Sequence, residues 1–501
     1  MKNLEELVMI LTEKEVKGPK DIQIEGVHYD SRQVKNGYLF LCIEGFTYDG
    51  HQFIPEALAR GAKALVVQKD VDVPEGVAVI KVPDTRKALP LLASQWYDHP
   101  SGKLGVVGVT GTNGKTTTTH LVESILQAAG KKTGLIGTVN NRIVNKVLPV
   151  ERTTPESVDL QKLLAQMVEE KVDCAVMEVS SHALELHRVD YCEYDVAVFT
   201  NITQDHLDFH NNIDSYLASK AKLFSQLDEE IFGKTKEQEK VGVINIDDPH
   251  SRFLREQTKV RVITYGVEND ADIMAKDIEV TLKGLKFRVV TPQGELKLTL
   301  NLTGLFNVYN SLAAIGAALA LSLPFTAIKE GLEKIKGVAG RFELVDEGQD
   351  FAVVVDYAHT PDSLENILKT AQAFVKGNII SVFGCGGDRD RTKRPIMGKI
   401  GTTYSDYSII TSDNPRSEEP SRITADVEEG AKEGGGQYEI IVDRKDAIKK
   451  AINHAQKDDM VIIAGKGHET YQIFRDGTVP FDDRQVAREF LRGIKGGKNN
   501  S

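Results

Sequence analysis

The stretch with the clearest chemistry is "TGTNGKTT", residues 110–117, which follows an apolar run and precedes a segment with helical spacing of apolar residues. Glycines let the backbone approach phosphates closely, loop amides can cradle them, and Lys115 can neutralise their charge. A hydroxyl of Thr116 or Thr117 could ligate Mg²⁺. Val109 stands where the pattern GxxxxGK[ST] has its first glycine. A glycine-rich turn without a ligand is the alternative, but strand, loop and helix in this order favour a nucleoside triphosphate site.

A second candidate stretch is "DNPRSEEP", residues 413–420, which follows the apolar run "YSIIT". Pro415 fixes the backbone, and Asp413 and Asn414 favour a loop. The turn therefore holds Arg416 at the end of a predicted strand. A planar guanidinium held in this way can grip a carboxylate with two charge-assisted hydrogen bonds, so the stretch indicates an anion site.

Length and composition limit the class of protein. A chain of 501 residues predicts about three domains, and 41% hydrophobic with 27% charged residues is typical of a globular protein with ample core. The net charge of −11 disfavours a nucleic-acid partner or a membrane surface. The N-terminal segment has acidic residues within its apolar stretch, unlike a secretory signal, and no apolar run approaches the ~18 residues of a membrane span. Four scattered cysteines without a CxxC pair favour a reducing, cytoplasmic location.

Strand-like and helix-like stretches alternate along the chain, which predicts an α/β fold with a mostly parallel sheet. A first segment, residues 1–100, ends at the breaker "HPSG". A second segment, 101–335, contains the phosphate loop and the strands "CAVME" and "VAVFT". A third segment, 336–501, repeats the alternation, and its loops "DNPR" and "GKGHE" follow strands. Open α/β sheets bind ligands at such strand ends.

These motifs resemble those of the Mur ligase family, the ATP-dependent amino-acid ligases of peptidoglycan synthesis. The resemblance covers nearly the whole chain in order: "GVTGTNGKTTTTH", "RTTPES", "MEVSSHALELHRV", "TNITQDHLDFH", "LFNVYNSLAA", "GRFE", "DYAHTPDSL", "GCGGDRDRTKRP", "DNPR" and "AGKGHE". It implies a UDP-substrate-binding domain over 1–100, a central ATP-binding domain over 101–335 and a C-terminal Rossmann-like, amino-acid-binding domain over 336–501.

The pattern is most similar to family members that add the third residue of the stem peptide. It therefore implies a monomeric, cytoplasmic enzyme that uses ATP and Mg²⁺. Its expected partners are UDP-MurNAc-L-Ala-D-Glu and meso-diaminopimelate, which are joined through an acyl phosphate. Members that add L-lysine tend to carry a small residue where this chain has Arg416.

The resemblance also implies ATP and metal contacts. The ATP contacts are Gly111, Thr112, Asn113, Gly114, Lys115, Thr116, Thr117, Asn307, Arg341 and Asp356, with His359 beside the last. The catalytic residues are Lys115, Glu178, His206 and Lys220, and the metal ligands are Thr116, Glu178, His206 and carbamylated Lys220. Taken alone, Glu178 could be structural, Arg341 could form a salt bridge at a domain boundary, and Lys220 could be a surface lysine with Lys222 as its local competitor. Carbamylation requires a neutral amine, so burial or nearby cations must lower the pKa of the lysine.

Two further groups of residues are expected to bind the substrates. Contacts to the UDP-linked substrate are implied for Ser31, Thr153, Thr154, Ser180, Arg188 and, less securely, the loop 45–50. Contacts to the amino acid are implied for Arg389, Asp413, Asn414, Pro415, Arg416, Gly465 and Glu469. Arg416 would bind the far carboxylate of diaminopimelate and Glu469 its ammonium. Without the resemblance, the hydroxyl residues would be interpreted as helix caps.

Three alternatives stay open. An L-lysine-adding homologue would share everything except the arginine of "DNPR". A ligase that adds glutamate to folates would share the phosphate loop but should lack "DSR" and "DNPR". A nucleotide-binding protein without catalysis has no need for Lys115, Glu178, His206 and Lys220 together. No function is assigned to the polar segment 228–240.

Overall fold

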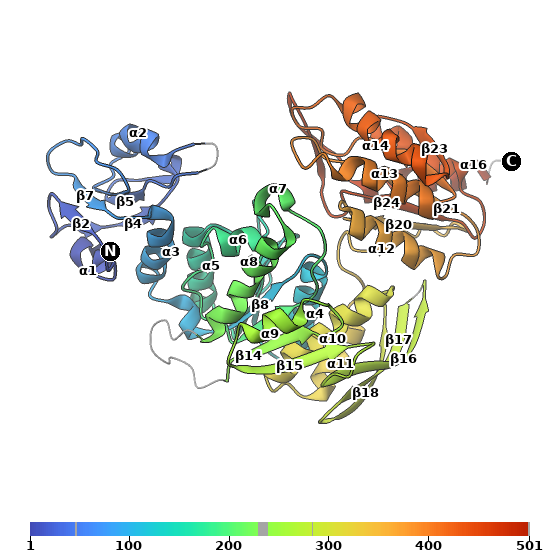
Figure 1. Cartoon of the computed structure of the whole chain (residues 1–501), viewed down its shortest axis with the longest axis horizontal. Coiled ribbons are helices and arrows are strands. Elements are labelled where there is room, and N and C mark those ends of the chain that lie inside the picture. Colours follow the sequence, from blue (N-terminus) through green and yellow to red (C-terminus); the bar gives the residue numbers. More distant parts are fainter. Residues whose placement is uncertain (46–47, 229–238, 283, 499–501) are drawn as a thin grey trace.

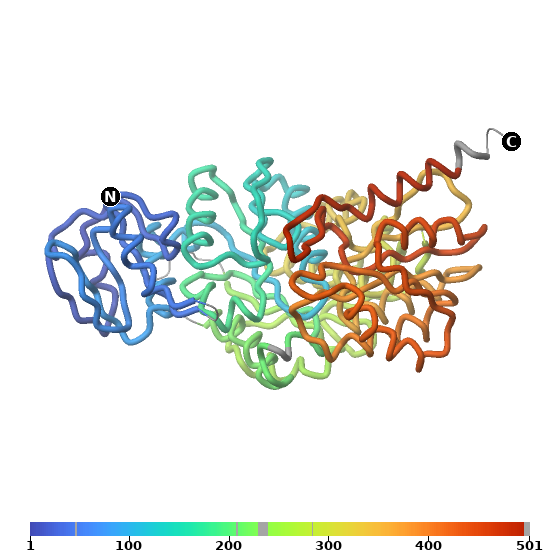
Figure 2. The backbone as a smooth tube through the Cα atoms, turned by 90° about the horizontal axis from the view of Figure 1, so that it is seen from above, coloured from blue at the N-terminus to red at the C-terminus, as the bar shows by residue number. Residues whose placement is uncertain are grey.

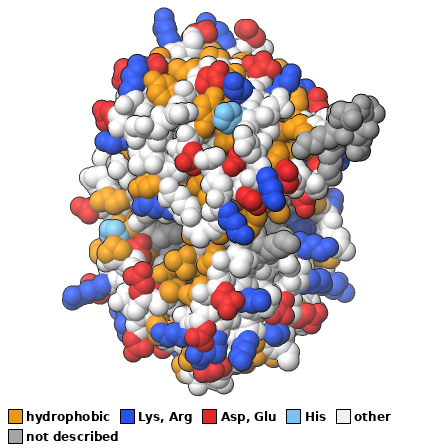
Figure 3. Space-filling model, turned by 90° about the vertical axis from the view of Figure 1, so that its right-hand side faces the viewer, with side chains coloured by type: hydrophobic (Ala, Val, Ile, Leu, Met, Phe, Trp, Pro, Cys, Tyr) orange, Lys and Arg blue, Asp and Glu red, His pale blue; other side chains and the backbone are white. Residues whose placement is uncertain are grey.

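The computed structural model describes residues 1–45, 48–228, 239–282 and 284–498. The chain forms three bodies in a row, each built around its own sheet (Figure 1), and the view from above shows the same succession from the N-terminus to the C-terminus (Figure 2). On the face seen in Figure 3, acidic and basic side chains intermingle and hydrophobic side chains form small groups. No helix of the described residues is long and apolar enough to cross a membrane.

The first domain has a five-stranded sheet in the order β2-β7-β6-β5-β4, in which only β2 runs antiparallel to its neighbour. Its strands are β2 (Glu15–Lys17), β4 (Gly26–His28), β5 (Tyr38–Leu41), β6 (Ala64–Val67) and β7 (Ala78–Lys81), with a small sheet of β1 (Lys2–Asn3) and β3 (Gln23–Ile24). Its helices are α1 (Leu4–Val8), α2 (Ile54–Ala59) and α3 (Thr85–Trp96). The Asp84 carboxylate caps α3 by accepting hydrogen bonds from two backbone amides.

The central domain has an eleven-stranded sheet in the order β11-β10-β9-β12-β8-β13-β14-β15-β16-β17-β18. The seven strands from β9 to β16 in that order are parallel, and antiparallel strands extend both edges. The strands are β8 (Gly105–Thr110), β9 (Thr133–Ile136), β10 (Asn141–Ile143), β11 (Lys146–Leu148), β12 (Cys174–Glu178), β13 (Val196–Phe199), β14 (Val241–Asn245), β15 (Arg261–Gly266), β16 (Ile273–Thr281), β17 (Gly284–Thr291) and β18 (Gly294–Leu300).

Helices cover both faces of the central sheet, because its parallel strands are apolar on both sides. One apolar core lies against α4 (Lys115–Ala128), α10 (Leu305–Ala320) and α11 (Phe325–Lys334). The other lies against α5 (Ser157–Glu169), α6 (Ser181–Glu185), α8 (Ile213–Ser225) and α9 (Ser251–Glu256), with α7 (Leu207–His210) nearby. β8 lies between β12 and β13, so the loops after these three strands meet at one edge.

The C-terminal domain has a six-stranded sheet in the order β19-β20-β24-β21-β22-β23, parallel except for β19. Its strands are β19 (Glu343–Leu344), β20 (Ala352–Asp356), β21 (Ile379–Phe383), β22 (Tyr407–Ile410), β23 (Gln437–Ile440) and β24 (Met460–Ala464), with a hairpin of β25 (Tyr471–Phe474) and β26 (Gly477–Pro480). Its helices are α12 (Pro361–Gln372), α13 (Lys393–Tyr404), α14 (Pro420–Gly434), α15 (Arg444–His454) and α16 (Asp483–Lys498). The prediction of a three-domain α/β protein with a mostly parallel central sheet is confirmed.

A buried ion pair ties the C-terminal domain together near the carboxyl end of β24. Arg444 donates two hydrogen bonds to Asp483, from Nε at 2.8 Å and from Nη2 at 2.7 Å, and both side chains are fully buried. Arg444 also donates to the carbonyl of Ala464 at the end of β24, at 2.9 Å. The pair therefore joins α15, α16 and the central strand of this sheet.

We predict that Asp483→Ala lowers the free energy of unfolding of this domain by about 3–5 kcal/mol, because it leaves a buried guanidinium without its partner. Scanning calorimetry measures this change. Tryptophan fluorescence is unsuitable, because Trp96, the only tryptophan of the chain, lies in the first domain. Glu489→Ala is the control, because its ion pair with Lys445 at 3.1 Å is exposed and should contribute about 0–1 kcal/mol. Equal effects of the two substitutions would contradict the prediction.

Candidate active site

The phosphate loop leaves β8 in a conformation that requires glycine at two positions. Gly111 has a φ of +149° and Gly114 a φ of +86°. A Cβ on Gly111 would lie 1.9 Å from Oγ1 of Thr200, and one on Gly114 would lie 2.3 Å from Oδ1 of Asn310. The loop therefore packs directly against the segment after β13 and against α10.

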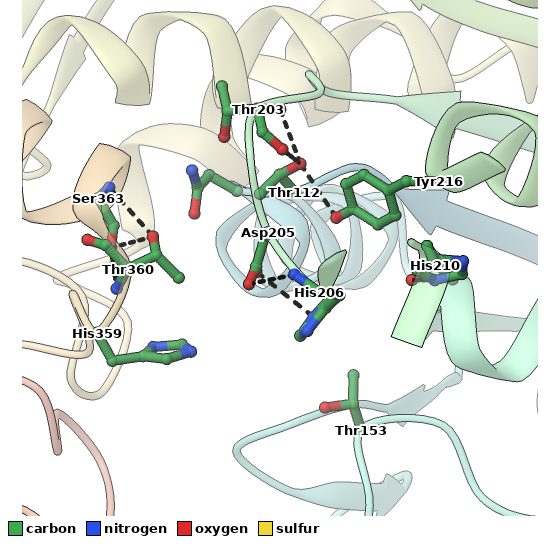
Figure 4. A network of polar contacts seen from close by, with 12 residues as sticks. Thr112, Thr153, Thr203, Asp205, His206, His210, Tyr216, His359, Thr360 and Ser363 are labelled. Carbon is green, nitrogen blue, oxygen red and sulfur yellow. Dashed lines mark hydrogen bonds and ion pairs between the residues drawn. The ribbon is translucent and has the colours of Figure 1, made fainter. Parts of the chain in front are cut away.

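Asn201, just after β13, holds the loop from one side. The backbone amide of Thr112 donates to the Asn201 carbonyl at 2.8 Å, and the amide of Asn113 donates to Oδ1 of Asn201 at 3.0 Å. The Thr112 hydroxyl lies 3.1 Å from the hydroxyl of Tyr216 on α8 (Figure 4). These contacts hold the loop against the segment after β13 and against α8.

Lys115, the first residue of α4, folds back over the loop. Its Nζ donates to the carbonyls of Gly111 at 2.9 Å and Thr112 at 2.8 Å. Burial, opposed by Glu178 and Asp205, lowers the pKa of Lys115. The loop glycines and this lysine thus lie together, as the predicted phosphate site requires.

Thr116 and Glu178 come together beside this predicted phosphate site. The Thr116 hydroxyl donates to Oε2 of Glu178 at 3.1 Å, and Glu178 is buried at the end of β12. Thr138 donates to the same carboxylate from its backbone amide at 2.8 Å and from its hydroxyl at 3.0 Å. A hydroxyl and a carboxylate oxygen are the donors that Mg²⁺ prefers, so this pair fits a magnesium ion.

His206 is oriented by other neighbours. It pairs with Asp205 at 3.4 Å, as Figure 4 shows, and its ring lies edge-on to that of His182 with centroids 4.8 Å apart. Its φ of +54° is unusual for a residue other than glycine. Burial lowers the pKa of His206. The nearby Asp205 carboxylate raises this pKa and His182 lowers it further. The ring is therefore neutral and can ligate a metal. No described contact joins His206 to Glu178 directly.

Lys220 on α8 is buried against the underside of the loop. Its Nζ donates to the Gly111 carbonyl at 2.7 Å and lies 4.5 Å from the ring centre of Tyr216. Burial, and then the charge of Lys115, lower the pKa of Lys220 well below its usual range, the direction that favours the neutral amine needed for carbamylation. Lys222, the local competitor, is exposed and pairs with Glu185 at 2.7 Å.

The C-terminal domain reaches the phosphate loop through two side chains. Arg341 donates from Nη2 to the Thr116 hydroxyl at 3.1 Å, and its guanidinium lies 4.6 Å from the ring centre of Tyr357. Asp362, at the start of α12, accepts a hydrogen bond from Nδ2 of Asn113 at 2.7 Å. The sequence interpretation did not single out Asp362, because an acidic residue in the first turn of a helix also favours the helix dipole.

Three other expected ATP-site residues have internal partners. Asp356 accepts hydrogen bonds from the backbone amides of Phe342 at 2.6 Å and Ala358 at 2.7 Å, and burial raises its pKa. Asn307 is buried and accepts a hydrogen bond from Asn310 at 3.0 Å, and a Cβ on Gly114 of the phosphate loop would lie 2.3 Å from Oδ1 of Asn310. His359 lies on the C-terminal side of the domain seam (Figure 4), and its Nδ1 is 2.7 Å from the Tyr357 carbonyl.

The residues expected to bind the UDP-linked substrate gather beside Glu178, with one exception. The Thr154 hydroxyl donates to the Glu178 carbonyl at 2.8 Å and to the Ser180 hydroxyl at 3.3 Å, and the hydroxyls of Thr153 and Thr138 are 3.0 Å apart. Ser180 also caps α6, as the alternative interpretation expected.

Three arginines gather around one buried carboxylate beside this group. Arg188 pairs with the buried Glu156 at 3.3 Å, and Arg86 and Arg152 each approach Glu156 at 3.6 Å. No pattern in the sequence predicts this arrangement. Ser31, the exception, donates to Glu56 at 2.7 Å within the first domain and does not join the group. Residues 46–47 of the expected contact loop 45–50 lie outside the described residues.

The amino-acid residues converge where the "DNPR" and "GKGHE" loops meet. Nδ2 of Asn414 donates to Oε2 of Glu469 at 2.9 Å, and Lys466 donates to both residues. Gly465 has a φ of +118°, and a Cβ there would lie 2.6 Å from Oδ2 of Asp413. Lys466 lies inside a recognised motif but was not singled out, because a lysine in a loop is usually solvated.

Arg416 lies at the open side of this convergence. Its φ is +54°, its Nη1 donates to the Gly387 carbonyl at 2.8 Å, and its side chain is half-buried. A Cβ on Gly387 would lie 1.9 Å from the Pro415 carbonyl, so the turn packs closely on the loop after β21. Burial, followed by the nearby Arg389, lowers the pKa of Arg416. Arg389 itself is exposed and contacts the Asp388 carbonyl at 2.9 Å.

Known families match all three domains. The family descriptions are "Mur ligase family, catalytic domain" over residues 23–97, "Mur ligase middle domain" over 109–318 and "Mur ligase, glutamate ligase domain" over 340–467. Proteins named UDP-N-acetylmuramoyl-L-alanyl-D-glutamate–2,6-diaminopimelate ligase are similar. The one from Bacillus licheniformis is 50% identical over 95% of this chain and 96% of its own, and the one from Geobacillus thermodenitrificans is 51% identical over 94% and 95%.

Solved structures agree with these matches. A structure with the same ligase name has a TM-score of 0.69 and 32% identity, and covers 99% of both chains. The MurF ligase of Thermotoga maritima in complex with ADP has a TM-score of 0.65 at 18% identity, covering 98% of this chain and 99% of that one, which shows a shared fold.

We predict that Lys220→Met raises the melting temperature at pH 7 by about 2 °C or more in CO₂-free buffer. The pKa of Lys220 is lower in the folded than in the unfolded chain, so unfolding takes up a proton below the usual lysine pKa of about 10.4 and wild-type stability falls as the pH falls. Methionine has no ionisable group, so the variant takes up no proton at this position when it unfolds. The difference between variant and wild type should therefore shrink toward pH 10.

Thermal melts from pH 7 to pH 10 measure this difference, and Lys222→Met, which removes an exposed lysine of the same helix, is the matched control. A variant that melts below wild type by the same amount at every pH would contradict a neutral, buried Lys220.

Proposed function

Because this chain belongs to the Mur ligase family, we propose that it is an ATP-dependent ligase joining meso-2,6-diaminopimelate to the D-Glu of UDP-MurNAc-L-Ala-D-Glu. Ligases of that name are about half identical to it over nearly their whole length. The observation that carries the choice of amino acid is the guanidinium of Arg416, half-buried at the convergence of the "DNPR" and "GKGHE" loops and close to Glu469.

In the first step the D-Glu side-chain carboxylate attacks the γ-phosphate of ATP, which forms an acyl phosphate and releases ADP. The amides of the phosphate loop and Lys115 are suited to hold the phosphates of ATP, and Arg341 reaches the same place from the C-terminal domain. Mg²⁺ would neutralise charge on the phosphate oxygens. Thr116 and Glu178 would hold one ion, and Glu178, His206 and carbamylated Lys220 would hold a second.

The substrates must then be held in line. Thr153, Thr154, Ser180 and Arg188 border the Glu178 site and offer hydroxyls and a cation for the acidic dipeptide, and Ser31 is suited to the UDP end from the first domain. The amine of the amino acid attacks the acyl carbon, the bond to the phosphate breaks, and inorganic phosphate leaves. Positioning of both reactants supplies much of the rate enhancement in such a reaction.

Diaminopimelate and lysine differ at the far end of the molecule, where diaminopimelate has a carboxylate beside its amine. Arg416 would bind that carboxylate, with Arg389 as a second cation and Glu469 for the ammonium. Lysine would leave the guanidinium without its anion, and breaking such a pair costs about 3–5 kcal/mol. Discrimination of roughly a hundredfold or more follows without editing.

The lysine-adding homologue, the folate ligase and a non-catalytic nucleotide-binding protein are the alternatives that the experiments below must exclude. The domain limits at residues 100 and 335, the cytoplasmic location and the monomeric state stay predictions.

Phosphate release tests the proposed function directly. With ATP, Mg²⁺ and UDP-MurNAc-L-Ala-D-Glu present, we expect release on addition of meso-diaminopimelate and at least about a hundredfold lower kcat/KM with L-lysine. Equal use of lysine would keep the ligase but contradict the role of Arg416. Release with neither amino acid would favour one of the other two alternatives.

Arg416→Ala should lower kcat/KM for diaminopimelate by about a hundredfold or more, because a charged carboxylate loses its partner. The KM for ATP should stay unchanged, since the phosphate loop lies in another domain. Arg475→Ala is the control, because this arginine is exposed and donates to the Ser417 carbonyl at the rim of the same loop, at 2.7 Å. A wild-type rate of Arg416→Ala at low diaminopimelate would show that the arginine has another role.

A further inference from the structure

Lys466 is a buried lysine at the centre of the amino-acid region. It follows β24, and its side chain is 0% exposed. Its Nζ donates to Oδ1 of Asn414 at 3.0 Å and to Oε2 of Glu469 at 2.8 Å, and lies 5.5 Å from the ring centre of Tyr471. Lysine is almost never fully buried unless its charge is paired, so this placement requires a reason.

The first consequence of Lys466 is geometric. Asn414 also donates to Oε2 of Glu469 at 2.9 Å, so amide, carboxylate and ammonium form a closed triangle. The backbone amide of Ile473 donates to Oδ1 of Asn414 at 3.1 Å, so this oxygen accepts hydrogen bonds from both Lys466 and Ile473. Oε2 of Glu469 thus receives two donors, whereas Oε1 receives none from the described residues. Lys466 therefore fixes the direction in which Glu469 can accept a ligand's N–H groups.

The second consequence is electrostatic. Four charged side chains act on the charge of Arg416: Arg389, Asp413, Glu469 and Asp388. With Lys466, this region has three cations and three carboxylates, so their charges balance. Arg444 and Asp483 below it neutralise each other at 2.7 Å. A ligand group with both a carboxylate and an ammonium adds no net charge here, whereas a lone ammonium adds a positive charge beside Lys466.

We propose that Lys466 is a positioning residue that determines specificity: its fixed ammonium orients Asn414 and Glu469 and disfavours acceptors whose far end is an ammonium without a carboxylate. This inference rests on the proposed function, since it concerns the choice between diaminopimelate and lysine. It differs from the role of Arg416, which attracts the carboxylate, because Lys466 acts against the wrong substrate.

Two substitutions separate the geometric from the electrostatic consequence. Lys466→Met removes both the hydrogen bonds and the charge at similar length. Lys466→Gln keeps a hydrogen-bond donor toward Glu469 but removes the charge. Phosphate release is measured with saturating ATP and UDP-MurNAc-L-Ala-D-Glu, and kcat/KM is determined for meso-diaminopimelate and for L-lysine.

For Lys466→Met we expect kcat/KM for diaminopimelate to fall about tenfold or more. The ratio of kcat/KM for diaminopimelate to kcat/KM for lysine should also fall about tenfold or more. Lys466→Gln should recover most of the diaminopimelate activity and still show the lowered ratio. The KM for ATP should change less than about twofold in both variants, because the phosphate loop is in another domain. Lys445→Met, which removes an exposed lysine of α15, is the matched control and should change nothing.

Two outcomes for Lys466→Met would overturn the inference. If kcat/KM fell equally with both amino acids, so that their ratio stayed unchanged, Lys466 would support the fold without selecting the substrate. Wild-type values for Lys466→Met would exclude both roles. If melting curves show that Lys466→Met does not fold, the ratio for Lys466→Gln decides. Absence of phosphate release by the wild type with diaminopimelate would instead refute the proposed function, a result that the variants do not affect.

Discussion

The close packing of the phosphate loop against the segment after β13 is the constraint on which the rest of the site depends. Gly111 leaves no room for a side chain beside Thr200, and its carbonyl accepts hydrogen bonds from both Lys115 and Lys220. One carbonyl thus gathers two lysines, and burial with their mutual repulsion lowers the pKa of Lys220. The loop geometry therefore controls both the predicted phosphate site and the chemistry available to the buried lysine.

The second organising feature is the meeting of two domains at this loop. Thr116 contacts Glu178 of its own domain and Arg341 of the C-terminal domain, and Asn113 contacts Asp362 of the C-terminal domain. In the proposed reaction, the phosphate and the amino acid would be held by different domains, so these contacts would link the two halves of the reaction. A ligase needs such a link, because the amine must reach an activated carboxylate that water could otherwise attack.

In the proposed amino-acid site, selectivity would follow from fixed charge. Arg416 presents a guanidinium at an open edge, whereas Lys466 is enclosed and bonded to the two side chains that would accept an amine. An attractive and a repulsive element together discriminate more strongly than either alone. Both elements are supported from below by the buried pair of Arg444 and Asp483.

The sequence by itself determined the fold class, the family and the identity of most candidate residues. Alternating apolar runs predict parallel strands, and the spacing of Gly111, Gly114, Lys115 and Thr116 predicts a phosphate loop, because these are local properties of the chain. It also indicated that "DNPR" and "GKGHE" follow strands. Local patterns do not, however, state which loops meet.

Only the tertiary structure decided which side chains face one another and which are buried. It enclosed Lys220 and exposed Lys222, two residues apart on one helix, and it kept Ser31 within the first domain. In the folded chain Asp362 contacts Asn113, which is 249 residues away in the sequence. Lys466 contacts Asn414, 52 residues away, and Glu469, 3 residues away. Burial and long-range pairing arise from the packing of whole sheets and domains, and they set the charge state of a side chain, which its position in the sequence does not reveal.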